Sequence, residues 1–223
     1  MFSVPVISEK TVARLALYRR LLVVLVIQGR RSIDSHERAG LAKVSAAVVR
    51  RDLMAVGYEG SPTRGYAIDD LVQALSHLLD HPATQKVALV GVGNLGRALL
   101  SYFAGRASQY SVAAAFDADP GKVGHAVNGC PVYAPDRLAE MIERDGIEVA
   151  IVAVPAGDAQ RTVHDLCGAG ITGILNFAPV RVWVPEGLYI EYLDMSMSLE
   201  RVAFFARSKR RGSWSHTEGA GRE

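Results

Sequence analysis

Three glycines set between two apolar segments form the most informative motif of the chain. Gly91, Gly93 and Gly96 have the spacing G-x-G-x-x-G, between an apolar run at 86–90 and a helix-like run at 97–103. In dinucleotide-binding folds, a strand, a glycine turn and a helix in this order hold a pyrophosphate against the N–H groups of the helix start. We therefore predict a dinucleotide site at the loop Gly91, Val92, Gly93, Asn94, Leu95 and Gly96.

An acidic residue lies where such a site needs one. Asp117 ends the apolar run 111–116 and follows the last glycine at about the 20-residue spacing of a ribose-binding carboxylate. A carboxylate there accepts hydrogen bonds from the ribose hydroxyls and repels a 2′-phosphate, which favours NAD(H) over NADP(H). The alternative is a solvated aspartate at a strand end, before the turn at 119–121.

A second group of residues, near the N-terminus, carries arginines. Ser45 is a suitable N-cap for a helix at 46–56, and Ala47, Arg50 and Arg51 fall on the side of this helix away from its apolar positions. After a short helix and a brief turn, this arrangement is typical of a helix-turn-helix that contacts bases and phosphates. A three-helix domain with ordinary solvated arginines is the alternative.

The following segment, 58–66, is rich in turn-forming residues and is predicted as a β-hairpin wing, with a plain linker as the alternative. Residues 1–66 carry eleven Lys and Arg but five Asp and Glu, whereas residues 67–200 carry eight and sixteen. A basic segment joined to an acidic remainder indicates a polyanion-binding module. The predicted DNA contacts are Lys43, Ser45, Ala47, Arg50, Arg51 and Arg64.

Length and composition allow two modest domains for these two sites. The chain has 223 residues, of which 49% are hydrophobic, and its two cysteines, Cys130 and Cys167, form neither a disulfide framework nor a metal site. The apolar run at 21–27 is too short to cross a bilayer and lies too far from the start for a signal peptide. We expect a cytoplasmic protein with no membrane contact.

The predicted first domain, 1–82, is largely helical. Val12, Leu15, Leu22 and Val26 are expected to form the buried face of the first helix, with its arginines elsewhere. The predicted helices span 8–28, 35–41, 46–56 and 68–79.

The predicted second domain, 83–194, alternates strands and helices, which indicates a parallel Rossmann sheet with right-handed crossovers. Beyond Asp117, strands are expected at 131–133, 148–155, 173–177 and 189–193, and helices at 136–144 and 158–167. Ligands bind at the carboxyl ends of such strands. The glycine loop and Asp117 should therefore surround one site together with Ala153, Val154, Pro155, Asn176, Phe177, Ala178 and Pro179.

The last predicted helix, 195–207, is more apolar than one packed face requires, which marks it as a candidate dimer contact. Its apolar residues include Met197, Leu199, Val202, Phe204 and Phe205. The basic tail at 208–223 is expected to be disordered.

Taken together, these motifs resemble the Rex family of bacterial redox-sensing transcriptional repressors, over roughly residues 6–207. The motifs that carry the resemblance are Arg50-Arg51-Asp52-Leu53, Gly65-Tyr66, Gly91 to Gly96, Ala115-Phe116-Asp117 with Lys122-Val123-Gly124, Val154-Pro155-Ala156, and Gly173-Ile174-Leu175-Asn176-Phe177-Ala178-Pro179.

The resemblance implies an N-terminal winged helix, a Rossmann domain and a C-terminal helix swapped between the subunits of a homodimer. It also implies that NAD⁺ permits operator binding and that NADH releases the operator, and it adds Lys122 to the cofactor site. A symmetric dimer predicts an operator with an inverted repeat. The wing tip Ser61-Pro62-Thr63 departs from the family's more basic, glycine-rich tip and leaves only Arg64 there.

Three polar residues are candidates for the switch between the two redox forms. Tyr102 lies on the helix after the glycine loop, Asp194 precedes the last helix, and Arg14 lies on the first helix. The hypothesis is that Asp194 pairs with Arg14 in the DNA-competent state and that NADH re-routes this pair with the participation of Tyr102.

Other functions fit the sequence less well. An NAD-dependent dehydrogenase needs a substrate domain and a proton-transfer residue, but residues 180–223 are few, and His125 and His164 lie away from the predicted crevice. A nucleotide- or CoA-binding module without DNA does not explain the basic first domain. A thiol sensor is disfavoured because neither cysteine has a C-x-x-C partner. We therefore predict no catalytic residues.

Overall fold

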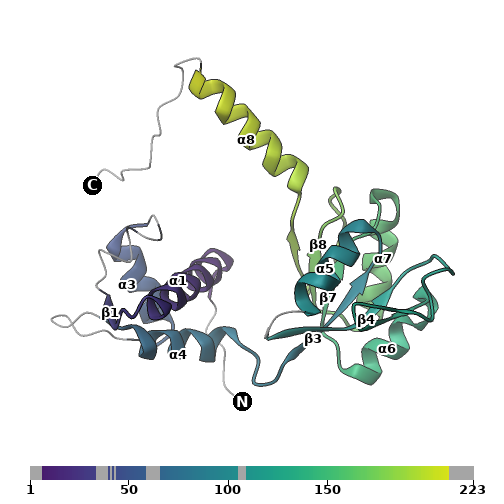
Figure 1. Cartoon of the computed structure of the whole chain (residues 1–223), viewed down its shortest axis with the longest axis horizontal. Helices are drawn as coiled ribbons and strands as arrows, with labels where there is room; N and C mark the ends of the chain where they lie inside the picture. The colour runs from purple at the N-terminus through teal and green to yellow at the C-terminus, as the bar shows by residue number, and fades with distance from the viewer. Residues whose placement is uncertain are drawn as a thin grey trace. The chain divides into compact units, whose positions relative to one another are not determined.

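The computed structural model describes residues 7–33, 40, 42, 44–58, 66–104 and 109–210 (Figure 1). The chain forms two compact units, Met1–Pro82 and Ala83–Glu223, each with its own hydrophobic core. Within the described ranges, no helix combines the length and the apolar character that crossing a bilayer requires.

The N-terminal unit packs helices around one core. Its described elements are α1 (Glu9–Ile27), β1 (Ser32–Ile33), α3 (Ala46–Ala55), β2 (Tyr66–Ala67) and α4 (Ile68–Leu79). Ser8 and Ser45 cap α1 and α3, each accepting a hydrogen bond at its side-chain oxygen from the backbone N–H three residues on, which confirms the predicted helix starts. Most of the helix predicted at 35–41 lies outside the described residues.

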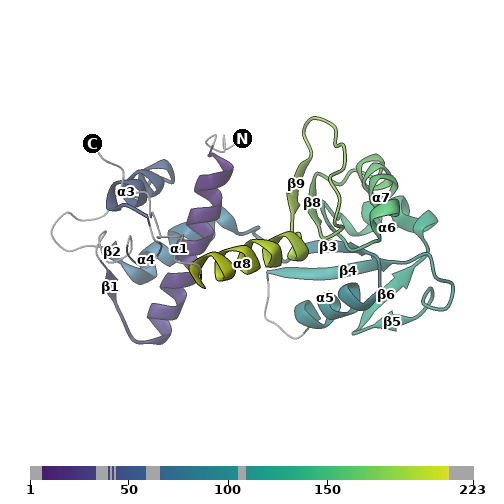
Figure 2. The same ribbon diagram turned by 90° about the horizontal axis from the view of Figure 1, so that it is seen from above.

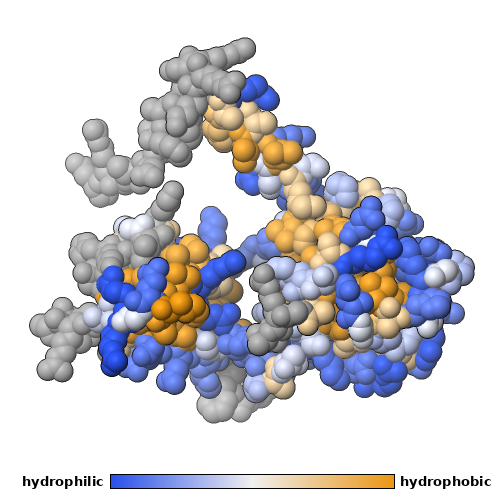
Figure 3. Space-filling model, viewed as in Figure 1, coloured by the Kyte–Doolittle hydropathy of each residue, from blue (hydrophilic) through white to orange (hydrophobic). Residues whose placement is uncertain are grey.

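The buried face of α1 differs from the predicted one. Leu15, Tyr18, Leu22 and Leu25 face the core, and among the predicted residues Val12 and Val26 are 41% and 40% exposed. Helix α1 is apolar on nearly every side, so its sequence could not identify the face that meets α3 and α4. Figure 3 shows apolar surface over α1.

A two-stranded antiparallel sheet begins at the end of the segment 58–66 that was predicted as a wing. Ser32 and Ile33 of β1 pair with Ala67 and Tyr66 of β2. Strand β1 was not predicted, because two residues carry no recognisable periodicity. Residues 59–65, including the predicted wing tip Ser61-Pro62-Thr63 and Arg64, lie outside the described residues.

The C-terminal unit is a Rossmann-type α/β fold (Figures 1 and 2). Its seven-stranded sheet has the order β5-β6-β4-β3-β7-β8-β9 and is parallel except for the short β5, which was not predicted. Its strands are β3 (Gln85–Val90), β4 (Tyr110–Phe116), β5 (Ala126–Val127), β6 (Cys130–Tyr133), β7 (Val149–Val152), β8 (Gly173–Asn176) and β9 (Tyr189–Tyr192). The strand order reverses between β3 and β7, which places a ligand crevice at their carboxyl ends.

Helices cover both faces of this sheet. Leu100 of α5 (Asn94–Ala104) packs with Leu89 and Ala115 on one face. On the other face, a core that includes Phe116 and Ala150 is covered by α6 (Leu138–Asp145), which follows the short η1 (Pro135–Arg137), and by α7 (Ala156–Gly168). The alternation of strands and helices predicted from the sequence is confirmed.

The last element, α8 (Met195–Arg210), projects from the end of β9 (Figure 1). It extends past the predicted end at residue 207, so residues 208–210 are helical rather than part of the tail. Residues 211–223 lie outside the described part of the chain. Met195, Leu199, Val202 and Phe204 are each more than half exposed in the single chain.

Candidate functional site

The glycine loop connects β3 to α5, and each of its three positions requires or favours glycine for a different physical reason. Gly91 has φ +98°, and a Cβ there would overlap the carbonyl of Ala153. A Cβ on Gly96 would overlap the carbonyl oxygen of Gly91, because α5 packs directly on the loop. A Cβ on Gly93 would meet no atom within 4 Å, so its side is open for an approaching group. The strand, turn and helix therefore have the predicted arrangement, which holds a pyrophosphate in other dinucleotide-binding folds.

Asp117 lies at the carboxyl end of β4, beside this loop. Its Oδ2 accepts a hydrogen bond from the backbone N–H of Val92 at 2.7 Å and one from Lys122 Nζ at 3.1 Å, and its Oδ1 accepts one from the N–H of Asp119 at 2.9 Å. Burial alone would raise the pKa of Asp117, but these hydrogen bonds outweigh it and hold the pKa below its ordinary value. The carboxylate is therefore ionised at neutral pH.

A cavity of about 320 Å³ opens at the ends of β3, β4 and β7. Four of the predicted cofactor residues line it, namely Gly91, Asp117, Val154 and Pro155. Its other lining residues are Val90, Phe116, Ala118, Pro135, Leu138, Asp158, Arg161, Thr162 and Asp165. Asp158, Arg161, Thr162 and Asp165 lie three or four residues apart on one face of α7. This spacing is the sequence signal that could have indicated them.

The segment after β8 is built differently from the prediction. Asn176 is 1% exposed, its amide nitrogen donates to the carbonyls of Ala178 and Val180 at 3.3 and 3.2 Å, and its Oδ1 accepts from the N–H of Ala178 at 3.0 Å. Its polar atoms thus shape the loop, and the predicted contact of Asn176 with the cofactor stays a prediction. Ala153 and Phe177 are half-buried, Ala178 is buried, and Pro179 is exposed.

Three of the predicted DNA contacts, Ala47, Arg50 and Arg51, lie on α3, and Ser45 is its N-cap. Ala47, Arg50 and Arg51 are exposed, whereas Val49 and Leu53 are buried, so the predicted orientation of α3 is confirmed. Ser45 is exposed at the N-terminus of α3. Lys43 lies outside the described residues, as does Arg64.

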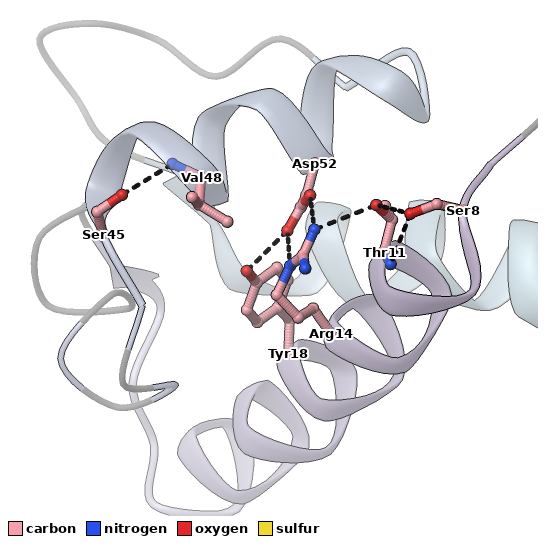
Figure 4. A network of polar contacts seen from close by, with 7 residues as sticks. All are labelled: Ser8, Thr11, Arg14, Tyr18, Ser45, Val48 and Asp52. Atoms are coloured by element: carbon pink, nitrogen blue, oxygen red, sulfur yellow. Dashed lines mark hydrogen bonds and ion pairs between the residues drawn. The ribbon is translucent and has the colours of Figure 1, made fainter. Parts of the chain in front are cut away.

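Helix α3 also carries a buried acid, Asp52, which was expected only as part of the motif Arg50-Arg51-Asp52-Leu53 and without a role of its own. Asp52 is 3% exposed and accepts three hydrogen bonds from α1 (Figure 4). Arg14 Nε donates to its Oδ2 at 2.7 Å and Arg14 Nη2 to its Oδ1 at 2.6 Å, while the Tyr18 hydroxyl donates to Oδ2 at 2.9 Å. The available signal was an acidic residue beside the apolar positions 49, 53 and 56 of an amphipathic helix.

The three predicted switch residues are each engaged within their own unit. Arg14 is held by Asp52, on the side of α1 that faces α3 (Figure 4). Asp194 Oδ1 accepts a hydrogen bond from the N–H of Met197 at 2.9 Å and so caps α8. Tyr102 is 48% exposed on α5. The Nε and Nη2 groups of Arg14 are thus already used by Asp52 and Thr11.

The cysteines are poor candidates for redox chemistry. Burial raises the pKa of Cys130 to about 11 and also raises the pKa of Cys167, which disfavours the reactive thiolate at both positions.

Two family models match the two units. A model described as CoA binding domain matches residues 83–180, and one described as putative DNA-binding protein N-terminus matches residues 6–53. The redox-sensing transcriptional repressor Rex of Streptomyces coelicolor is 40% identical over 203 residues, which cover 91% of this chain and 79% of that protein.

Solved structures agree over nearly the whole chain. RSP, a Rex-family repressor, in complex with β-NAD⁺ and operator DNA is 28% identical with a TM-score of 0.85, covering 96% of this chain and 99% of that one. RSP in complex with β-NADH is 28% identical with a TM-score of 0.82, covering 93% and 97%.

Proposed function

Because the chain belongs to the Rex family of redox-sensing transcriptional repressors, we propose that it binds operator DNA with NAD⁺ and releases it with NADH. The observation that carries this proposal is that one chain joins an arginine-bearing α3 to a nucleotide crevice containing an ionised Asp117. Such a repressor acts on the chromosome, so we also propose that it works in the cytoplasm.

The deciding experiment is a titration of the protein–operator complex with NADH and, separately, with NAD⁺. NADH should dissociate the complex, and NAD⁺ should leave it intact. Incubation with NADH and candidate oxidants, followed by absorbance, tests the dehydrogenase alternative, for which a steady consumption of NADH would be the sign. The relatives are named as transcriptional repressors, which favours release of the operator by NADH over consumption of NADH.

The cofactor is proposed to bind with its adenosine ribose on Asp117 and its pyrophosphate on the open side of Gly93. A carboxylate offers about four acceptor positions, and backbone and Lys122 donors use three of those of Asp117. Lys122, which already contacts Asp117, can donate to a ribose hydroxyl as well. The other predicted residues without a contact described above are also proposed contacts, namely Asn94, Leu95, Ala153, Phe177, Ala178 and Pro179.

Asp117→Ala should weaken NADH binding by about 1–3 kcal/mol, because hydrogen bonds to a charged group are removed. The affinity for NADPH should fall less, since the repulsion of its 2′-phosphate disappears. Calorimetric titration measures both. Asp119→Ala is the matched control, as Asp119 carries the same charge two residues away but its side chain is half exposed. Equal wild-type affinities for NADH and NADPH would contradict the assignment.

The protein is proposed to act as a homodimer through α8. Among the described residues, α8 and the outward face of α1 both expose apolar side chains in the single chain (Figure 3). The outward face of α1 consists of Val12, Ala13, Ala16, Leu17, Arg20, Val23, Val24 and Ile27. Exposed apolar helices of this size are commonly covered by a partner. A second copy supplies both halves of such a contact and presents two α3 helices to an inverted repeat.

Leu199→Glu with Val202→Glu should convert the dimer into monomers, because two carboxylates would be buried in an apolar contact. Sedimentation velocity measures the change. Arg201→Glu adds negative charge to the same helix at a polar position and should leave the dimer intact. A double variant that sediments as the wild-type dimer would exclude α8 as the interface.

The redox switch is proposed to be an ion pair between Asp194 and an arginine of α1, with Tyr102 taking part. Arg14, which the sequence suggested as the partner of Asp194, already binds Asp52. Arg20 is exposed at the centre of the outward face of α1, and within the described ranges no salt bridge involves it. Arg20 is therefore the better candidate, since α8 begins next to Asp194 and a partner's α8 on this face would bring the two charges together.

Asp194→Asn should keep NADH binding within several-fold but lose much of the difference in operator affinity between the NAD⁺ and NADH forms. Asparagine caps a helix as well as aspartate, so only the charge is removed. Arg20→Met should give the same loss if Arg20 is the partner. Electrophoretic mobility shifts measure the release. A variant that releases its operator at the wild-type NADH concentration would exclude this route.

A further inference from the structure

We propose that Asp52 is a positioning residue for operator recognition, which sets the rotation and the height of α3 through its contacts with Arg14 and Tyr18. The inference rests on the proposed DNA-binding role of α3. It assigns a function to a buried charge that neither the cofactor site nor the proposed switch uses.

The network joins α3 to α1 by directional contacts (Figure 4). Two residues one helical turn apart on α1 converge on one carboxylate, and Arg14 is bidentate. Arg14 Nη2 also donates to Thr11 Oγ1 at 3.1 Å, and Thr11 Oγ1 is hydrogen-bonded to the Ser8 cap at 3.0 Å. The position of Asp52 is therefore tied to the first turn of α1.

Apolar packing alone does not fix α3 in the same way. Its fully buried apolar residues are Val49 and Leu53, and apolar contact is not directional. Consecutive residues of a helix differ by about 100° in direction and 1.5 Å in height. Holding Asp52 at a fixed angle therefore fixes the directions of its neighbours Arg50 and Arg51, which are both exposed.

The chemistry of the buried ion pair between Arg14 and Asp52 indicates a role other than stabilising the fold. The side chains of Asp52 and Tyr18 are almost completely buried, and that of Arg14 is 28% exposed. Desolvation of such a pair offsets much of its attraction, so apolar residues of similar size often give equal or greater stability. Buried ionic groups can instead specify one arrangement among several. Burial and the hydrogen bond to Asp52 together raise the pKa of Tyr18 to about 12, so its hydroxyl remains a donor at every physiological pH.

The test compares a double variant, Arg14→Met with Asp52→Leu, with the wild-type full chain in the presence of NAD⁺. An operator is first selected from random DNA by the wild-type protein. Affinities for this operator and for a scrambled duplex of the same composition are then measured at one salt concentration by fluorescence anisotropy. The control removes another ion pair of α1, Arg19→Met with Asp80→Leu, which joins α1 to the end of α4 and does not touch α3.

The double variant should remain folded, with its unfolding temperature lowered only because the buried Tyr18 hydroxyl loses its acceptor. It should bind the operator at least 10-fold more weakly and bind the scrambled duplex within 3-fold of wild type. The control should keep wild-type discrimination. Tyr18→Phe removes only the hydroxyl and should reduce the discrimination between operator and scrambled duplex about 3-fold. It replaces the double variant in the test if the double variant does not fold. Wild-type discrimination by a folded double variant, or by Tyr18→Phe, overturns the inference. A wild-type protein that selects no operator would instead refute the proposed function.

Discussion

Gly96→Ala should destabilise the C-terminal unit by about 3 kcal/mol and abolish measurable NADH binding. Its new methyl group would overlap the carbonyl oxygen of Gly91, and because both groups belong to the backbone, neither can move aside as a flexible side chain would. Overpacking of this kind typically costs about 1–3 kcal/mol, and the helix must also shift away from the loop that binds the phosphates. Denaturant unfolding and calorimetric titration measure the two effects.

Gly93→Ala is the matched control, because the same methyl group there meets no protein atom within 4 Å. This variant should unfold like the wild type but bind NADH at least 10-fold more weakly, or about 1.4 kcal/mol, since its methyl group fills space that a pyrophosphate needs. If Gly96→Ala has the stability and the NADH affinity of the wild type, α5 does not pack on the loop as closely as described. If Gly93→Ala binds NADH normally, the pyrophosphate lies elsewhere.

Arg50→Ala with Arg51→Ala should lower operator affinity at least 100-fold, or about 3 kcal/mol, with NADH binding unchanged. Each arginine that binds a base edge contributes about 1–3 kcal/mol, and in a dimer the substitution acts on both half-sites. Both side chains are exposed, so the fold should be unaffected. Fluorescence anisotropy at several salt concentrations also gives the salt dependence of binding, whose slope should fall by about one for each arginine that binds a phosphate in the wild type.

A variant with the same change in charge separates base recognition from general attraction. Arg137→Ala with Arg144→Ala removes two exposed arginines from the C-terminal unit and should leave operator affinity within about 3-fold of wild type, because long-range attraction is screened by salt. Equal reductions in both double variants would mean that α3 contributes only charge. In that case α3 would not be the recognition helix.

The elements with strong local signals were predictable from the sequence. The glycine spacing and Asp117 identified the crevice, and the apolar strands indicated the parallel sheet, because buried strands and helix caps leave clear patterns in composition. Ser45 fixed the start of α3 and so the outward direction of Arg50 and Arg51, which the structure confirms.

What could not be predicted depends on contacts between distant residues. Helix α1 is apolar on nearly every side, so its buried face is determined by packing against α3 and α4 rather than by its own hydrophobic period. The partner of Arg14 is 38 residues away on another helix, and Asn176 was expected to contact the cofactor although its amide holds its own loop. Pairing of this kind is set by tertiary packing and has no local signature.

The hydrogen bond from the Val92 N–H to Asp117 has a consequence for the way a sensor of this build responds. It ties the glycine loop to the end of β4 by a contact within the protein itself, so the shape of the adenosine half of the crevice does not depend on which form of the nucleotide binds. NAD⁺ and NADH are identical in that half and should gain the same binding energy from it. The two forms then compete for one site, and at saturation occupancy depends on their relative amounts. Changes in the total pool would leave the state of the repressor unaltered.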